Sequence, residues 1–135
     1  MAGLVCDIVT PAAKLFSNNA YMVVVPGVEG EMGFLQGHVP LVSLLADGVV
    51  RIQAENGSEQ KRFALQGGYV QVTGQKVIIL ADRALPAEEV DANAVRASLA
   101  DYEAKRAALS PEEVALTTLD ADISWCNAQL KAVAV

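Results

Sequence analysis

PGVEGEMGFLQGHVPL, residues 26–41, holds four glycines, two prolines, two glutamates and the only histidine of the chain. Glycine allows backbone conformations that other residues avoid, and proline fixes φ and removes a backbone donor. We therefore expect this stretch to be a shaped loop between two strands. Shaped loops on rigid scaffolds often contact other molecules, so the stretch is also the first candidate for a binding site.

The rest of the first 85 residues alternates between apolar and polar positions, as strands do. Candidate strands span residues 4–10, 20–25, 39–45, 49–53, 61–65, 69–73 and 76–81. Tight turns are expected at Glu55-Asn56-Gly57-Ser58 and Thr73-Gly74-Gln75, and Gly67-Gly68 predicts a bulge or a close backbone contact. Many short strands with such turns predict an antiparallel β-sandwich or barrel over residues 1–85.

Around Pro86 the pattern changes to that of helices. Residues 87–109 are rich in Ala, Glu, Arg and Leu, and Asp91 is placed to cap a helix. One apolar stripe follows the helical period, with Arg106 as its polar interruption; it consists of Val95, Leu99, Tyr102 and Leu109.

A second helix is predicted to begin at Ser110-Pro111-Glu112-Glu113, which combines an N-cap, proline at the first helical position and a capping box. Its apolar residues recur at spacings of three and four: Leu116, Leu119, Ile123, Cys126, Leu130 and Val133. Residues 86–135 should therefore form an antiparallel helical hairpin, which makes the chain an α+β protein of two parts. The same apolar seam can pack on the first helix or on another protein.

Composition excludes several classes of function. The 135 residues carry a net charge of −6, which disfavours nucleic acid and anionic lipid. No apolar run is long enough to insert into a membrane. Cys6 and Cys126 are isolated and the chain has one histidine, so we expect no metal site and no nucleophile–base pair of an enzyme.

Three blocks of the sequence resemble the epsilon subunit of bacterial F-type ATP synthases. They are EGEMG…GHVPL (residues 29–41), LQGGYVQV (residues 65–72) and LAD (residues 80–82), and the match in element order covers essentially the whole chain. The resemblance implies a non-catalytic rotor subunit that links the gamma subunit to the c-ring and couples proton flow to ATP synthesis. It also implies a peripheral location on the cytoplasmic face of the bacterial inner membrane, as part of the synthase.

The resemblance also assigns candidate interface residues. The loop with Glu29, Gly30 and Glu31 matches the c-ring contact of the family, continuing through Met32 and Gly33, and His38 lies in the matching stalk-interface segment. The bare residues allow a simpler interpretation, in which the two glutamates only solvate a turn and His38 is a hydrogen-bonded loop histidine.

The helical hairpin of the family acts as a movable inhibitor near the alpha and beta subunits of the catalytic head, and in some members its folded form binds ATP. Here the matching motif has Asp91, but its arginine position holds Ala94, and Arg96 falls on another face of the helix. Triphosphate needs such charge-assisted donors, so we expect weak or no ATP binding and no other cofactor.

The second helix has a single base, Lys131, and the bases of the first, Arg96, Lys105 and Arg106, have acidic neighbours such as Asp101 and Glu103. We therefore expect constitutive coupling with weak inhibition of ATP hydrolysis. The alternative that the residues leave open is a free-standing β-sandwich binding or adaptor module with a helical hairpin.

Overall fold

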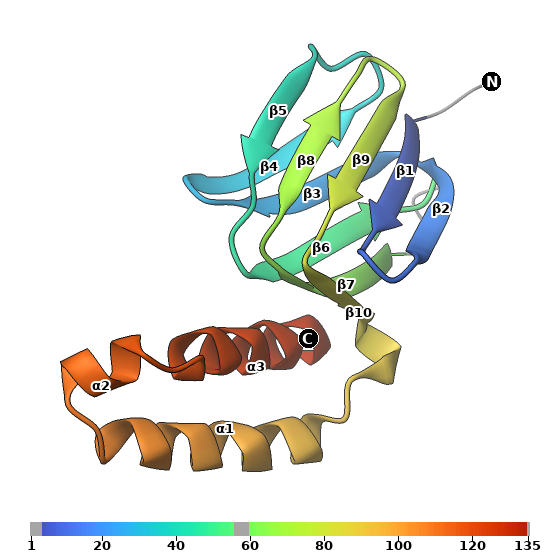
Figure 1. Ribbon diagram of the computed structural model, residues 1–135. Helices are drawn as coiled ribbons and strands as arrows, with labels where there is room; N and C mark the ends of the chain where they lie inside the picture. Colours follow the sequence, from blue (N-terminus) through green and yellow to red (C-terminus); the bar gives the residue numbers. More distant parts are fainter. Residues whose placement is uncertain (1–3, 56–59, 135) are drawn as a thin grey trace.

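The computed structural model describes residues 4–55 and 60–134, which fold into a β-sandwich followed by a set of helices stacked against one side of it (Figure 1). The α+β class predicted from the sequence is confirmed. The sandwich consists of two five-stranded sheets, which we call the β1 sheet and the β6 sheet.

The β1 sheet faces the viewer in Figure 1. Its strands, in spatial order, are β2 (Lys14–Ala20), β1 (Leu4–Val9), β9 (Lys76–Leu80), β8 (Tyr69–Val72) and β5 (Leu41–Leu44). Neighbours are antiparallel except β1 and β9, which run parallel. The sequence pattern predicted antiparallel pairing only, and the parallel β1–β9 pair corrects that prediction.

The β6 sheet lies behind it. Its strands are, in order, β10 (Arg83–Pro86), β7 (Gln60–Gln66), β6 (Gly48–Gln53), β3 (Met22–Gly27) and β4 (Gly30–Leu35). All of its pairings are antiparallel.

The core between the sheets is aliphatic, as the small aromatic content leads one to expect. Inward-facing residues such as Leu4, Ile8 and Val70 have no exposed surface, and Phe34 is the largest fully buried side chain. Cys6 is part of this core, and burial, with the nearby Asp7 carboxylate, raises its pKa to about 12. An apolar, protonated Cys6 thiol has a packing role.

Three strand predictions need correction. Residues 26–41 are not one loop: Gly30–Leu35 forms β4, which pairs along its length with β3. The strand expected over residues 20–25 is β3, Met22–Gly27, because Ala20 ends β2. β2 and β10 were not predicted, since β2 is largely polar and exposed and β10 is only four residues long. The turn expected at residues 55–58 lies largely outside the described residues.

The Gly67-Gly68 pair makes the close backbone contact that was predicted. Both residues have positive φ, +61° and +108°. A Cβ on Gly68 would lie 2.0 Å from the carbonyl oxygen of Leu80, so β8 can leave the β7–β8 turn beside β9 only because this residue has no side chain.

The helical part begins with a single 3-10 turn, η1 (Ala87–Glu89), followed by α1 (Ala92–Ala107). Asp91 caps α1 as predicted, because its side chain accepts a hydrogen bond from the Ala94 N–H at 3.1 Å. The second predicted start is also confirmed. Ser110 and Glu113 exchange both hydrogen bonds of a capping box at the beginning of α2 (Pro111–Ala115). Hydrogen bonding from Ser110, first through its backbone N–H and then through its side chain, lowers the pKa of the Glu113 carboxyl.

The second helix is not continuous, contrary to expectation. It breaks after α2 and resumes as α3 (Leu119–Val133), although residues 112–133 contain no glycine or proline. Thr117 stabilises the break: its hydroxyl donates to the Val114 carbonyl at 2.7 Å and accepts from the Leu119 N–H at 3.2 Å. As a result Leu116, predicted in the apolar seam, is 89% exposed.

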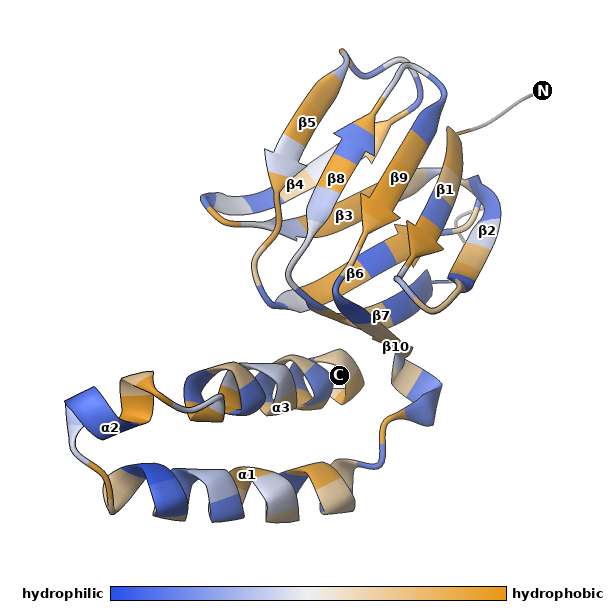
Figure 2. Ribbon diagram, viewed as in Figure 1, coloured by the Kyte–Doolittle hydropathy of each residue, from blue (hydrophilic) through white to orange (hydrophobic). Residues whose placement is uncertain are grey.

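α3 is the middle layer, with the sandwich on one side and α1 on the other (Figures 1 and 2). Ala132 packs on Val49 and Ala64, which face outward from the β6 sheet. Polar contacts add to this packing. Arg62 donates to the carbonyl oxygens of Ala132 and Ala134 in the last turn of α3 and just beyond it, and Gln66 donates to that of Ala121 at 3.1 Å. Arg83 lies 5.7 Å from the centre of a Trp125 ring.

Candidate functional site

The β3–β4 turn is the part of residues 26–41 that protrudes from the sandwich (Figure 1). Gly27 and Gly30 form its last pair, and Val28 and Glu29 between them are exposed. A Cβ on Gly27 would lie 2.6 Å from the Gly30 carbonyl oxygen, and Gly30 has a φ of +130°. The two glycines therefore permit this tight turn, and Glu29 extends from it into solvent.

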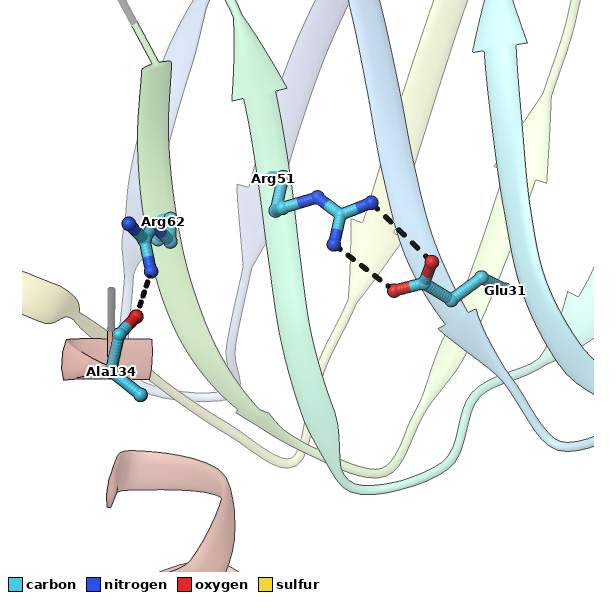
Figure 3. A network of polar contacts seen from close by, with 4 residues as sticks. All are labelled: Glu31, Arg51, Arg62 and Ala134. Carbon is cyan, nitrogen blue, oxygen red and sulfur yellow. Dashed lines mark hydrogen bonds and ion pairs between the residues drawn. The ribbon is translucent and has the colours of Figure 1, made fainter. Parts of the chain in front are cut away.

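Glu31 is held by an ion pair that crosses a strand. Both of its carboxylate oxygens lie 3.3 Å from guanidinium nitrogens of Arg51, on β6, and the pair passes over β3 (Figure 3). The Glu31 side chain is 52% exposed and that of Arg51 39%. Such bidentate geometry fixes the direction of the carboxylate while leaving it accessible. Sequence reasoning did not connect these two residues, because they are paired only through the sheet.

Met32 and Gly33 lie on opposite faces of β4. Met32 is partly buried and packs on the core between the sheets. Gly33 faces outward next to Val24, and a Cβ there would make only ordinary contacts. Of the predicted interface residues, Glu29, Gly30, Glu31 and Gly33 lie at the surface, whereas Met32 supports the turn from inside.

His38 lies beyond the other end of β4. Its Nδ1 donates to the Val39 carbonyl oxygen at 2.8 Å, and its ring meets that of Phe34 edge-on at 4.9 Å between centroids. The structure thus places His38 away from the β3–β4 turn, as a half-buried, hydrogen-bonded loop residue.

A second surface, which sequence reasoning missed, covers the outward side of the β1 sheet. Leu44, Tyr69 and Leu80 are directly paired across β5, β8 and β9, and each is between 45% and 52% exposed. Val42, on β5, is 66% exposed on the same side. We call these four residues, with the half-buried Val9 and Ile78, the apolar face.

The apolar face is open to solvent because the helices pack on the other sheet (Figure 1). It continues toward the β3–β4 turn, where the Val28 N–H donates to the Leu44 carbonyl at 3.2 Å. A row of large apolar side chains on a sheet surface is a feature of protein–protein interfaces. The sequence did contain a signal for this surface: β5 and β9 carry apolar residues on the outward side of the sheet as well as on the inward side.

The segment that matches the family's nucleotide motif, with Asp91 and Arg96 as a candidate vestigial site, borders a hollow of about 400 Å³ between α1, α3 and β10. Asp91 and Ala94 line it, but Arg96 does not, and its guanidinium donates instead to Asn93. The lining contains three carboxylates, of Glu89, Asp91 and Asp122, and one cation, Arg83. Repulsion from these carboxylates opposes the binding of a triphosphate.

The bases on the helices are paired, in part as predicted. Lys105 lies 3.0 Å from Asp101 one turn away. Arg106, however, pairs at 2.7 Å with Asp120 of α3 and so joins the two helices. Within residues 4–55 and 60–134 no group of three or more candidate metal ligands is present. None of the helices in this part of the chain is both long and apolar enough to span a bilayer.

Comparisons with known proteins agree on one family. The family model described as "ATP synthase, Delta/Epsilon chain, beta-sandwich domain" matches residues 4–87. The chain is 38% identical to an ATP synthase epsilon chain of Granulibacter bethesdensis over 90% of its length and 87% of the relative's. It is 39% identical to an ATP synthase epsilon chain of Acinetobacter baylyi over 70% of its length and 68% of the relative's.

A solved structure has the same fold. The chain superposes on a chain of the Euglena gracilis mitochondrial ATP synthase OSCP/F1/c-ring structure with a TM-score of 0.83, at 24% identity, covering 99% of this chain and 83% of that one. Together with the sandwich, its glycine-shaped turn and the helical hairpin, the matches show that this chain belongs to the ATP synthase delta/epsilon chain family.

Proposed function

We propose that this chain is a non-catalytic rotor subunit of a proton-translocating F-type ATP synthase, where it links the gamma subunit to the c-ring and couples proton flow to ATP synthesis. The observation that carries the proposal is the apolar face, a row of exposed large apolar side chains on a member of the delta/epsilon family. An adaptor module outside the synthase is not favoured, because the relatives from Granulibacter bethesdensis and Acinetobacter baylyi are named ATP synthase epsilon chains.

The gamma subunit is the occupant proposed for the apolar face. Subunits of a rotating shaft must bind one another tightly. Burial of the exposed side chains of Leu44, Tyr69 and Leu80 against gamma would supply hydrophobic binding energy. The face lies on the opposite sheet from the helices, so gamma can dock while the hairpin is folded.

The β3–β4 turn is the part proposed to contact the c-ring, through Glu29, Gly30, Glu31 and Gly33. Polar loops of a ring offer hydrogen-bond donors to carboxylates, and the Arg51 ion pair pre-orients that of Glu31. Met32 contributes by packing under the turn. For His38 we propose a stalk-interface role through the shape of its loop.

The helical hairpin, residues 86–135, is the regulatory part in this proposal, and residues 1–85 form the binding part. In the folded arrangement, α3 rests on the sandwich and its polar contacts to Arg62 and Gln66 are satisfied. Few free bases and an acidic hollow support weak inhibition of hydrolysis and little or no ATP binding. The chain itself has no active site in this proposal, and it acts on the cytoplasmic face of the bacterial inner membrane.

The test is replacement of Leu44 and Tyr69 by Ser, singly and together, with Leu116→Ser, at an 89% exposed position between α2 and α3, as a control away from the apolar face. The variants are added to a synthase F1 assembly that contains gamma and lacks this chain. We expect the double variant to bind at least about a hundredfold more weakly, since two anchor side chains at an interface are worth several kcal/mol together. Unchanged binding of the folded double variant would refute the proposed gamma face.

A further inference from the structure

Asp7 is an unusual residue on the outward side of the β1 sheet. Its neighbours Cys6 and Ile8 point into the core, so Asp7 points outward, yet it is only 4% exposed. The Ser17 hydroxyl donates to its Oδ1 at 2.7 Å. The ammonium groups of Lys76 and Lys14 lie 3.2 Å and 3.6 Å from its Oδ2.

This cluster carries more positive than negative charge. The Ser17 hydrogen bond and the two lysines lower the pKa of the Asp7 carboxyl, against the opposing effect of its burial, so Asp7 is ionised at neutral pH. The lysine side chains are about half exposed, at 56% and 46%. Among the described residues neither lysine has a second carboxylate within ion-pair distance. One positive charge is therefore unmatched on a protein whose net charge is −6.

The cluster lies beside the apolar face, on the same side of the sheet. Strand pairing places Asp7 next to Ile78, and Val9, two residues further along β1, next to Leu80. Any protein surface that covers Leu80 and Tyr69 thus brings its rim over Lys14 and Lys76. Charges at the rim of an interface mainly set orientation and association rate.

We propose that Lys14, Asp7 and Lys76 form a charged anchor that receives a carboxylate of the partner at the edge of the apolar face. The inference rests on the proposed function, in which that partner is gamma. It adds the chemistry of recognition: the partner surface carries an acidic side chain next to its apolar contact. Asp7 holds the two ammonium groups together, so they present one site instead of two separate mobile charges.

Single substitutions Lys14→Gln and Lys76→Gln test the anchor, because each leaves Asp7 with Ser17 and one lysine. Lys61→Gln, on the other sheet, is the control with the same change in net charge. We expect each anchor variant to associate roughly three- to tenfold more slowly at low salt with the F1 assembly lacking this chain, and to show a weaker salt dependence. Lys61→Gln should behave like the parent chain.

Asp7→Asn tests the sign of the effect. It removes the negative charge and keeps a hydrogen-bond acceptor for Ser17. Association at low salt should accelerate, because its rate follows the local net charge, while the complex should dissociate faster, because the two ammonium groups are no longer held together. If the cluster had only a structural role, Asp7→Asn would not accelerate association. Association by the lysine variants at the parent rate, or by folded Asp7→Asn at an equal or lower rate, overturns the anchor.

The two proposals fail in different ways. Strong loss of binding in the Leu44 and Tyr69 variants together with unaffected lysine variants keeps the gamma face and rejects the anchor. Unaffected binding in the Leu44 and Tyr69 variants rejects the gamma face, and with it the anchor. Urea unfolding of each variant establishes beforehand that it is folded.

Discussion

At Gly68 the backbone passes so close to β9 that no side chain fits. An added Cβ would lie 2.0 Å from the Leu80 carbonyl oxygen and 2.9 Å from the Ala81 Cα, and both are backbone atoms that cannot turn aside. The contact was predicted from the Gly67-Gly68 pair alone. What the sequence could not reveal was the neighbour, because Leu80 approaches through a β8–β9 pairing that only the folded sheet defines.

We predict that Gly68→Ala destabilises the chain by about 3 kcal/mol or more, because the clash adds to the strain of a positive φ. Gly74→Ala is the matched control, since nothing lies within 4 Å of a Cβ at that position. The free energies of unfolding are to be compared in urea. Equal stability of the two variants would show that the backbone at Gly68 moves aside easily.

For the helices, the residues at which they begin were easier to predict than the break between α2 and α3. The starts of α1 and α2 depend on local signals, Asp91 and the Ser110–Glu113 capping box, which are legible in the sequence. The break at Thr117 depends on hydroxyl hydrogen bonds that compete with the helix, and the apolar spacing continues straight through it. β4 was missed for a related reason. Its glycines suggested a loop, but pairing with β3 forms the strand.

Arg62 stabilises the docking of α3 on the β6 sheet. Its guanidinium binds carbonyl groups at the C-terminal end of α3, where unsatisfied carbonyls and the helix dipole favour a cation (Figure 3). The buried apolar side chains at this contact are small, Ala132 on Val49 and Ala64, and the large side chain that packs against them, that of Trp125, is partly buried. A charge-assisted hydrogen bond therefore contributes a large share of the docking energy.

We predict that Arg62→Gln weakens docking of α3 by about 1–2 kcal/mol and raises the undocked fraction of the hairpin. Trp125, the only tryptophan, reports this directly, because it packs on the sandwich beside Arg83 and its fluorescence emission should move to longer wavelength when α3 leaves. Lys61→Gln, one residue earlier on β7 with an exposed side chain, is the control. If Arg62→Gln leaves the emission spectrum unchanged, the prediction is wrong, and apolar packing supplies most of the docking energy.

For the whole molecule, the two sheets separate two surfaces. The outward side of the β6 sheet receives α3, and the outward side of the β1 sheet carries the apolar face and the Lys14–Asp7–Lys76 cluster. The α+β class and the order of sandwich and hairpin followed from periodicity, because that signal is local. Which sheet the hairpin covers depends on long-range contacts, such as that of Arg62 with Ala132, which no local pattern encodes.

Because the surfaces are separate, removal of the hairpin should leave the binding surface intact. We predict that a chain ending at Val90, which retains all of β10, folds and binds the F1 assembly within about threefold of the full chain's affinity. Val49 and Ala64 become exposed, but they are too small to collapse the sandwich. ATP hydrolysis by the reconstituted synthase should rise by less than about twofold, because we propose only weak inhibition for helices with few free bases.

Two measurements on the same reconstituted synthase separate the parts of this prediction. If the shortened chain binds more than about tenfold more weakly, the hairpin contributes to the gamma interface and the two surfaces are not independent. If binding is retained but hydrolysis rises sharply, the surfaces are independent and the hairpin is a strong inhibitor after all. In that case Arg62→Gln, which loosens the hairpin without removing it, should lower hydrolysis, if the undocked hairpin is the inhibitory form.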